Sequence, residues 1–555
     1  MQITADIDAL DLLAGNTTFH AINGTNGGVN AGTIIVQDAT FVVPVLNTLL
    51  GGSATLEIGG VFNNTGLISL NGQPHLLGLL DTDQETVLKA VGATTLTGGG
   101  HVTLSDVPLN IIDGTAGAVL TNVNNTISGS GFIEHVGFVN EAAGIVDANQ
   151  SRDLILAQSA TATNRGLMEG TGRAALVIAC TVDNTSGGVI EADGGRVGLE
   201  SATIIGGTLE TVNRGIIIAN IQGSVLDGRT EAVKIEGGLI VAHGSNLTIE
   251  GAIDNTGKFV VSATTLYPQI TDLIIGSSGA TLSGGGELIL TPHVENRVFG
   301  VDSAATLTNV DNRISGAGLL GNGVLTLDNE TAGIIVGNSA VGLTINTGGN
   351  VIQNAGLIYA SHGALVTIDS AVNNTGRLES QSGSLVVDGA VTGSGEGVVN
   401  GGTIDFASTF SENLVFGGSG EVVLAHSQSY GGTVYGFSKT KTTSLDLRDI
   451  GFGGSTRATY SGAASGGTLT VTDGTHTAHI AFKGDYLGST FTVSNDGHGG
   501  TIVKDPTTAS SAASAHRFVA AAAGLVARGA GSVALAQGSW QAHSLMLAKP
   551  AVMTA

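Results

Sequence analysis

The sequence predicts an all-β fold, an elongated parallel β-solenoid in which short strands stack coil upon coil. The first observation is composition: 555 residues include 87 Gly and only 7 Pro, and 12% are charged. Short apolar runs cut by Gly, Asn, Asp, Ser and Thr are typical of many short strands with tight turns. The second is repetition: residues 120–131 (LTNVNNTISGSG) return as residues 307–318 (LTNVDNRISGAG). Such strands bury little alone, so stacking is expected.

The repeated motif belongs to two long tandem blocks. Further pairs of segments match at nearly the same spacing: 61–70 with 252–261, 96–104 with 282–290, and 182–186 with 372–376. The blocks span about 56–210 and 247–405, and the region 1–405 is predicted to form the solenoid. Ahead of the first block, residues 33–36 and 41–43 are predicted strands, because turn-forming Gly and Asn precede them.

Asn-Asn pairs mark the predicted corners between strands. An Asn tolerates a left-handed corner, and stacked Asn side chains can hydrogen-bond to one another along the column. Successive coils are then expected about 4.8 Å apart. The rival fold is an array of β-sandwiches, which also uses short strands. Aromatic residues, the usual sandwich core anchors, make up only 4% of the chain, which favours the solenoid.

Residues 406–506 are predicted to form a C-terminal antiparallel module that could cap the solenoid. This segment is richer in Phe and Tyr than the rest of the chain. One hairpin joins 468–472 to 475–480 through Asp473-Gly474, and a second joins 489–493 to 501–503. Residues 507–555 form a low-complexity tail. Its Ala-rich stretch could form a short helix, and the tail is read either as an export address or as a weakly ordered end.

Charge and cysteine content limit the function classes. A net charge of −24 and a sequence pI of about 4.7 disfavour nucleic-acid binding, because an acidic surface repels phosphates. No apolar run reaches the ~18 residues of a transmembrane helix, and no Sec-type signal peptide is seen at the N-terminus. The single cysteine, Cys180, rules out an intrachain disulfide framework and is expected to be a buried, inert thiol.

Two possible cation sites are weighed against plain structural roles. Residues 496–500 (DGHGG) are similar to part of a Ca²⁺-binding nonapeptide repeat, but a single fragment cannot complete an oxygen shell, so a Gly-rich hairpin loop is expected. His476, His479 and His498 are candidate ligands for a transition metal. On one strand His476 and His479 would point to opposite faces, so exposed histidines are expected instead.

Polysaccharide cleavage is the third candidate chemistry. It needs two carboxylates that face each other across a glycosidic bond, or a base with a charge-neutralising cation. The acidic residues considered are Asp183, Glu191, Asp193, Glu200 and Glu210. They are spread one per strand or corner, so they are interpreted as solvated charges. No catalytic residue, metal ligand or cofactor site is therefore predicted.

The C-terminal module carries the most specific resemblance. Residues 468–480, 484–486 and 496–501, with Asp505-Pro506, resemble a C-terminal module of large repetitive exported proteins of Gram-negative bacteria. The Asn-Asn-Thr and Ile-Ser-Gly units are similar to the repeats of the same adhesin-like and autotransporter passenger-like proteins. The resemblance implies a secreted or cell-surface location and no defined catalytic residues. Nothing after residue 506 could supply the membrane barrel of an autotransporter.

The sequence thus predicts a non-enzymatic, exported, adhesin-like solenoid. It would display Thr/Ser/Asn-rich faces to a glycan, to extracellular matrix or to a cell surface, and would need export machinery whose identity the sequence does not give. The alternative is a carbohydrate-active β-helix enzyme, either a polysaccharide lyase or a glycoside hydrolase. Such an enzyme should have a cleft built by long loops on adjacent coils, with converging acids.

Overall fold

The computed structural model describes residues 27–37, 39–43, 48–72, 85–220, 223–265 and 269–506. It confirms the all-β solenoid, with about 16 turns of parallel strands and antiparallel strands at the C-terminal end. The chain divides into two units, residues 1–506 and 507–555. The predicted tail, with its helix and its export-address interpretation, lies outside the described residues.

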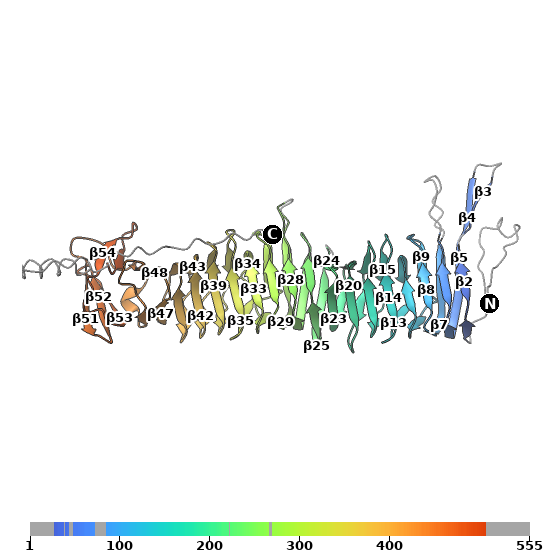
Figure 1. The fold of residues 1–555 in the computed structure, drawn as a ribbon, viewed down its shortest axis with the longest axis horizontal. Coiled ribbons are helices and arrows are strands. Elements are labelled where there is room, and N and C mark those ends of the chain that lie inside the picture. The colour runs from blue at the N-terminus through green and yellow to red at the C-terminus, as the bar shows by residue number, and fades with distance from the viewer. Residues whose placement is uncertain are drawn as a thin grey trace, which may run out of the picture. The chain divides into compact units, whose positions relative to one another are not determined.

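Each coil contributes three short strands, and each strand pairs in parallel with the equivalent strand one coil away (Figure 1). We call the three resulting columns of strands faces 1, 2 and 3. Face 1 includes β10 (Val119–Asn122), β13 (Gly137–Asn140), β16 (Ala162–Asn164) and β19 (Thr181–Asp183). Face 2 includes β11 (Thr126–Ser128), β14 (Ile145–Ala148), β17 (Leu167–Gly170), β20 (Val189–Asp193) and β23 (Gly207–Val212). Face 3 includes β12 (Gly131–Glu134), β15 (Leu154–Ala157), β18 (Ala175–Ile178) and β21 (Arg196–Leu199).

Some strands are long enough to turn a corner and contribute to two faces. These are β5 (Ala54–Asn64), β7 (Thr86–Thr97), β25 (Ser224–Glu236), β27 (Asn246–Asn255) and β29 (Thr271–Ser283). Inside, one apolar cluster runs from Ile34 to Val503. Cys180 belongs to this cluster as a buried free thiol, and burial raises its pKa. The expectation of a buried cysteine is confirmed.

Buried asparagines form a hydrogen-bonded ladder at the corner that follows face 1. The Asn122 Nδ2 donates to Asn140 Oδ1 at 3.0 Å, Asn140 to Asn164 at 2.9 Å, and Asn164 to Asn184 at 2.8 Å. Each of these side chains is fully buried. Because an unpaired amide is costly in an apolar interior, the ladder fixes every coil in register with the next. The predicted stacking of asparagines is confirmed.

The second block carries an equivalent ladder on a different corner of the column. It runs through Asn309, Asn329, Asn354 and Asn374, with Nδ2–Oδ1 distances of 2.9, 2.8 and 2.7 Å. Its strands β32 (Thr306–Asn309), β35 (Thr326–Asn329), β38 (Ile352–Asn354) and β41 (Val372–Asn374) extend face 2, through β29, β27 and β25 to β23. The repeated segment therefore ends one strand beyond a whole number of coils. The two blocks are rotated by a third of a turn relative to each other.

Antiparallel strands close the C-terminal end of the column. β51 (Arg457–Ala463), β52 (Gly466–Thr472) and β53 (Thr477–Lys483) form a meander, and β54 (Thr492–Asn495) pairs with β55 (Thr501–Lys504). β53 continues face 3 by pairing with β49 (Thr433–Tyr435), and β55 pairs with β50 (Thr443–Leu447) on face 1. Phe437 packs edge-on against Phe416 at 5.4 Å and against Phe482 at 5.3 Å, which joins the aromatic core of this end to the coils.

Three details differ from the sequence-based expectation. Parallel pairing does not stop at residue 405 but continues to β48 (Gly420–Leu424) and β50. The aromatic residues that begin at Phe406 are therefore partly interior residues of the last coils. Residues 41–43 do form a strand, but β3 (Ala39–Val43) pairs with β4 (Thr48–Gly52) in a separate two-stranded sheet. The third detail is the 473–476 loop, described below.

Removing one amide from the ladder should destabilise the column strongly. In Asn354→Ala, the Asn329 amide keeps only the Gly333 carbonyl as acceptor and the Asn374 side-chain oxygen loses its donor, both at buried positions. We expect a loss of about 2–4 kcal/mol, measured as a shift in urea-induced unfolding. The matched control is Asn373→Ala, because the half-buried Asn373 points outward and its side chain donates to the outward Gln353 side chain. Equal effects of the two substitutions would contradict a stabilising ladder.

Candidate functional surfaces

Face 2 presents outward rows of polar side chains in both blocks. In the first row, Ser69, Thr103 and Ser128 lie in register on successive coils. A second row, offset along the strand from the first, begins after Ala252 and consists of Thr281, Thr308, Asp328, Gln353, Asn373 and Thr392. Neighbouring members hydrogen-bond along the row, as Asn373 Nδ2 does to Gln353 Oε1 at 2.7 Å. The face is therefore a regular array of hydroxyl and amide groups.

Beyond Ser128 the first row becomes an acidic column. Asp147, Glu169, Glu191, Glu210 and Glu236 are direct partners on successive coils. Burial raises the pKa of Glu169 to about 7, and the negative charges of Asp147, Glu191 and Asp193 add to this effect. Burial and the charge of Glu210 also raise the pKa of Glu191. In the described part of the chain none of these five carboxylates forms an ion pair, so the column concentrates negative charge.

The structure places the five acids considered for sugar cleavage in four different settings. Glu191 and Glu210 are neighbours in the acidic column. Asp183 lies on face 1, and Asp193 accepts a hydrogen bond from Asn213 at 2.6 Å. Glu200 follows β21 on face 3 and accepts from Asn220 at 2.8 Å. The stacking of Glu191 with Glu210 was not expected from the sequence, in which the column's acids are separated by unequal intervals.

Two shallow grooves lie at equivalent corners of the column. Lys258, Glu287 and Arg313 line the first, together with Gly-rich backbone, and Arg377 and Glu396 line the second. The acid in each groove pairs with an arginine, Glu287 with Arg313 at 3.3 Å and Glu396 with Arg377 at 2.8 Å. Each groove thus holds a single acid, and that acid is already neutralised.

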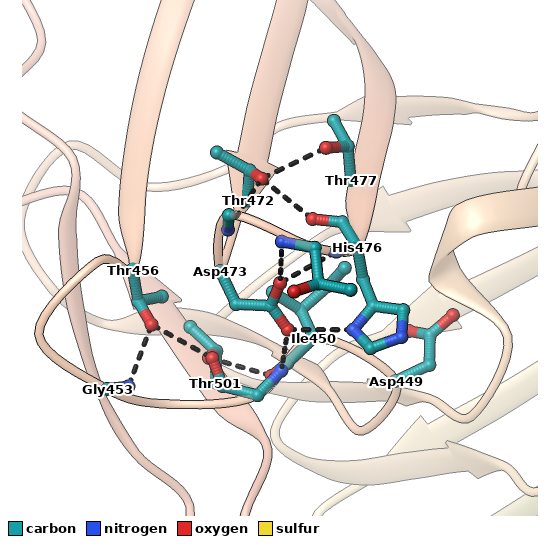
Figure 2. Close-up of polar contacts among 12 residues, drawn as sticks. Asp449, Ile450, Gly453, Thr456, Thr472, Asp473, His476, Thr477 and Thr501 are labelled. Atoms are coloured by element: carbon teal, nitrogen blue, oxygen red, sulfur yellow. Dashed lines mark hydrogen bonds and ion pairs between the residues drawn. The ribbon is translucent and has the colours of Figure 1, made fainter.

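The C-terminal hairpin loop is organised by one carboxylate, that of Asp473 (Figure 2). Its Oδ1 accepts from the backbone N–H groups of Thr475 and His476, both at 2.7 Å. Its Oδ2 accepts from Gly451 N at 3.0 Å and contacts His476 Nδ1 at 2.8 Å. These donors hold the pKa of Asp473 well below its usual range. Because Asp473 caps the turn in this way, 473–476 form a four-residue loop, not the expected Asp-Gly two-residue turn.

The three candidate histidines do not converge. His476 lies in the 473–476 loop, His479 lies on β53 and contacts Thr470 Oγ1 at 3.2 Å, and His498 lies in the β54–β55 loop. In that last loop Asp496 Oδ1 accepts from His498 N at 2.7 Å and from Gly500 N at 2.9 Å, as in an ordinary capped hairpin. Within the ranges that the structure describes, no group of three or more His, Cys, Asp or Glu could hold a metal ion.

The second asparagine ladder ends on a buried carboxyl group. Asn374 Nδ2 donates to Glu412 Oε2 at 2.6 Å, while Glu412 Oε1 has no hydrogen-bond partner. Tyr430 donates its hydroxyl to the Glu412 backbone carbonyl at 3.0 Å, and Phe410 stacks on Phe406 beside them. Burial raises the pKa of Glu412 to about 7. The ladder therefore closes on a carboxyl group that changes its protonation state near neutral pH.

No helix among the described residues has the length and apolar character needed to cross a membrane.

Two curated proteins are similar to this chain. Outer membrane protein A of Rickettsia rickettsii is 26% identical over 438 residues, covering 71% of this chain and 19% of the relative. Deoxyribonuclease CdiA of Dickeya dadantii is 28% identical over 379 residues, covering 63% of this chain and 10% of the relative. The chain thus spans a fifth or less of the length of these relatives. No protein-family model matches it. No solved structure matches it significantly.

The Glu412 carboxyl group should make stability depend on pH. Its folded pKa of about 7 lies above its ordinary value of 4.5, so the stability that protonation provides is full below pH 4.5 and is lost as pH rises through 7. Glu412→Gln should therefore gain up to about 3 kcal/mol over the parent at pH 8 and little at pH 4, in urea unfolding. The control Glu330→Gln, at an exposed corner, should show no such trend. A pH-independent difference for Glu412→Gln would contradict this account.

Proposed function

We propose that this chain is part of an exported, adhesin-like surface protein that acts by display and not by catalysis. The observation that carries the proposal is the unbroken polar row on face 2, repeated coil after coil on a rigid column. A regular array of hydroxyl and amide groups can donate and accept hydrogen bonds from a glycan or a matrix protein at many points at once.

The similar proteins support an extracellular or cell-surface location. One of them bears the name of an outer membrane protein, and both similarities extend over most of this chain. The deoxyribonuclease named in the second relative is a property of that protein, of which this chain spans 10%. Nucleic acid is also an unsuitable partner for a chain of net charge −24.

The alternative, a carbohydrate-active β-helix enzyme, has less support. The two grooves hold one neutralised acid each. The stacked acids of face 2 lie side by side on one face, and not across a cleft where a glycosidic bond could sit. Release of sugar products from acidic or neutral polysaccharides would favour this alternative over display.

Location is tested with protease on intact cells of the source bacterium. If the chain is displayed, added protease should remove it without lysis, while a cytoplasmic marker protein stays intact. Protection of the chain until the cells are broken would contradict surface display. Detection uses an antibody against the folded column, because an epitope in one corner loop could be lost by local cleavage alone.

Ligand binding by face 2 is tested on arrays of glycans and immobilised matrix proteins. We expect the triple variant Thr308→Ala, Gln353→Ala, Asn373→Ala to lose at least tenfold in affinity, because several hydrogen bonds of about 1 kcal/mol each are removed. The matched control is Thr163→Ala, Thr344→Ala, Thr367→Ala, three outward residues of face 1. Equal binding by both variants would exclude face 2 as the binding surface.

A further inference from the structure

Face 3 carries an outward-pointing apolar row that runs almost the length of the column. Starting at Val87, each outward residue is the direct strand partner of the next, as far as Val415. The row is interrupted only by Gly198, Ser315 and Glu379. Its apolar members are Val87, Ile111, Phe132, Ile155, Val177, Ile218, Ile240, Val260, Ile289, Val336, Tyr359, Val398 and Val415. We call this row the apolar stripe.

The other two faces have no comparable row. On face 2 the outward apolar residues Ile145, Leu167 and Val189 form a row of only three coils, beside polar and acidic positions. Outward positions of face 1 alternate between Thr or Asp and single aliphatic residues such as Val139 and Ile205. The face 3 strands therefore contain uninterrupted apolar triplets, as in Ile216–Ala219 (β24), whereas strands of the other faces alternate. In parallel sheets an uninterrupted apolar strand is the pattern of a strand that is buried on both sides.

Part of the stripe is open to solvent in the single chain. Phe132, Ile155, Ile218, Ile240 and Ile289 are each partly exposed, although their inward neighbours are fully buried. The members that are themselves buried between neighbouring side chains are Val87, Ile111, Val177, Val336 and Val398. Small side chains such as Ala157, Ala175 and Ala242 border it. A flat, continuous strip with low borders can approach another flat surface closely over its whole length.

The size of the stripe matches what a stable protein interface needs. Sixteen coils at about 4.8 Å give a strip about 70 Å long, and a side-chain row with its borders is about 10 Å wide. The resulting ~700 Å² per copy is close to the ~800 Å² per partner of a standard interface. A second copy of this chain offers the same strip with the same spacing, so the two match along their full length.

Charges at the edge of the stripe fit the same partner. Arg196 begins β21 and is exposed, and Glu200 directly follows the strand, so the two charges flank the stripe. A two-fold axis parallel to the column would place Arg196 of one copy opposite Glu200 of the other. A lipid surface fits less well, because a net charge of −24 repels anionic headgroups. We propose that the chain forms a parallel, two-fold dimer through the apolar stripe of face 3.

The dimer is tested by sedimentation velocity of the full chain across a range of concentrations. The wild type should sediment as a dimer. The triple variant Ile155→Thr, Ile218→Thr, Ile240→Thr keeps β-branched side chains but makes the stripe polar, and should raise the dimer dissociation constant at least about 100-fold. The matched control is Ile145→Thr, Leu167→Thr, Val189→Thr, three outward residues of face 2. It should remain dimeric, and circular dichroism should show both variants folded.

Charge reversal tests the arrangement separately. Arg196→Glu should weaken the dimer, and the double variant Arg196→Glu, Glu200→Arg should restore it, because each copy then again presents opposite charges across the axis. A monomeric wild type would overturn the proposal, and this includes the case in which the stripe binds some other protein instead of a second copy. A triple stripe variant that still dimerises would also overturn it. Failure of the double variant to restore association would overturn the parallel arrangement.

Discussion

The need of each buried asparagine amide for a partner directly above and below governs this fold. Asn140 receives a hydrogen bond from Asn122 and donates one to Asn164, and the interior members Asn164, Asn329 and Asn354 stand in the same relation to their neighbours. In an apolar interior no water can replace these partners. If one strand slipped by one residue relative to its partner, its buried amide and its inward aliphatic side chains would both turn to the outer surface. The ladder therefore sets the register of all three faces at once.

The ladder also explains how the two blocks can differ in orientation without strain. Each ladder depends only on strands within its own block, so the second can run along another corner. Because the repeated segment ends one strand past a whole coil, homologous side chains point in directions a third of a turn apart. Sequence similarity between the blocks therefore does not imply that the same face is used in both. The polar row of face 2 consists of different repeat positions in each block.

The solenoid, the repeated blocks and the stacked asparagines could be predicted, because local signals carry them: Asn-Asn pairs, Gly corners and a motif that returns at residue 307. The arrangement of side chains on the outer surfaces could not be predicted. Which way Ile218 points depends on pairing with Gly198 and Ile240, and a run of three isoleucines looks the same whether its middle residue faces in or out. The acidic column was missed because its members are unequally spaced, and Glu412 was missed because only the folded chain brings it beneath Asn374.

The interval between the two ladders has a mechanical consequence. The first ladder ends at Asn184, because Gly206 and Gly207 occupy the next corner, and an added Cβ at Gly207 would lie 2.1 Å from the Asn184 carbonyl oxygen. The second begins at Asn255. Strand hydrogen bonds run along the axis, so a pull on the two ends loads the coils in series. Between Asn184 and Asn255 the described coils share no asparagine ladder, and side-chain links such as Asn213 to Asp193 and Asn220 to Glu200 lie at exposed or half-buried positions. We therefore expect the rod to yield first to shear or tension in this interval.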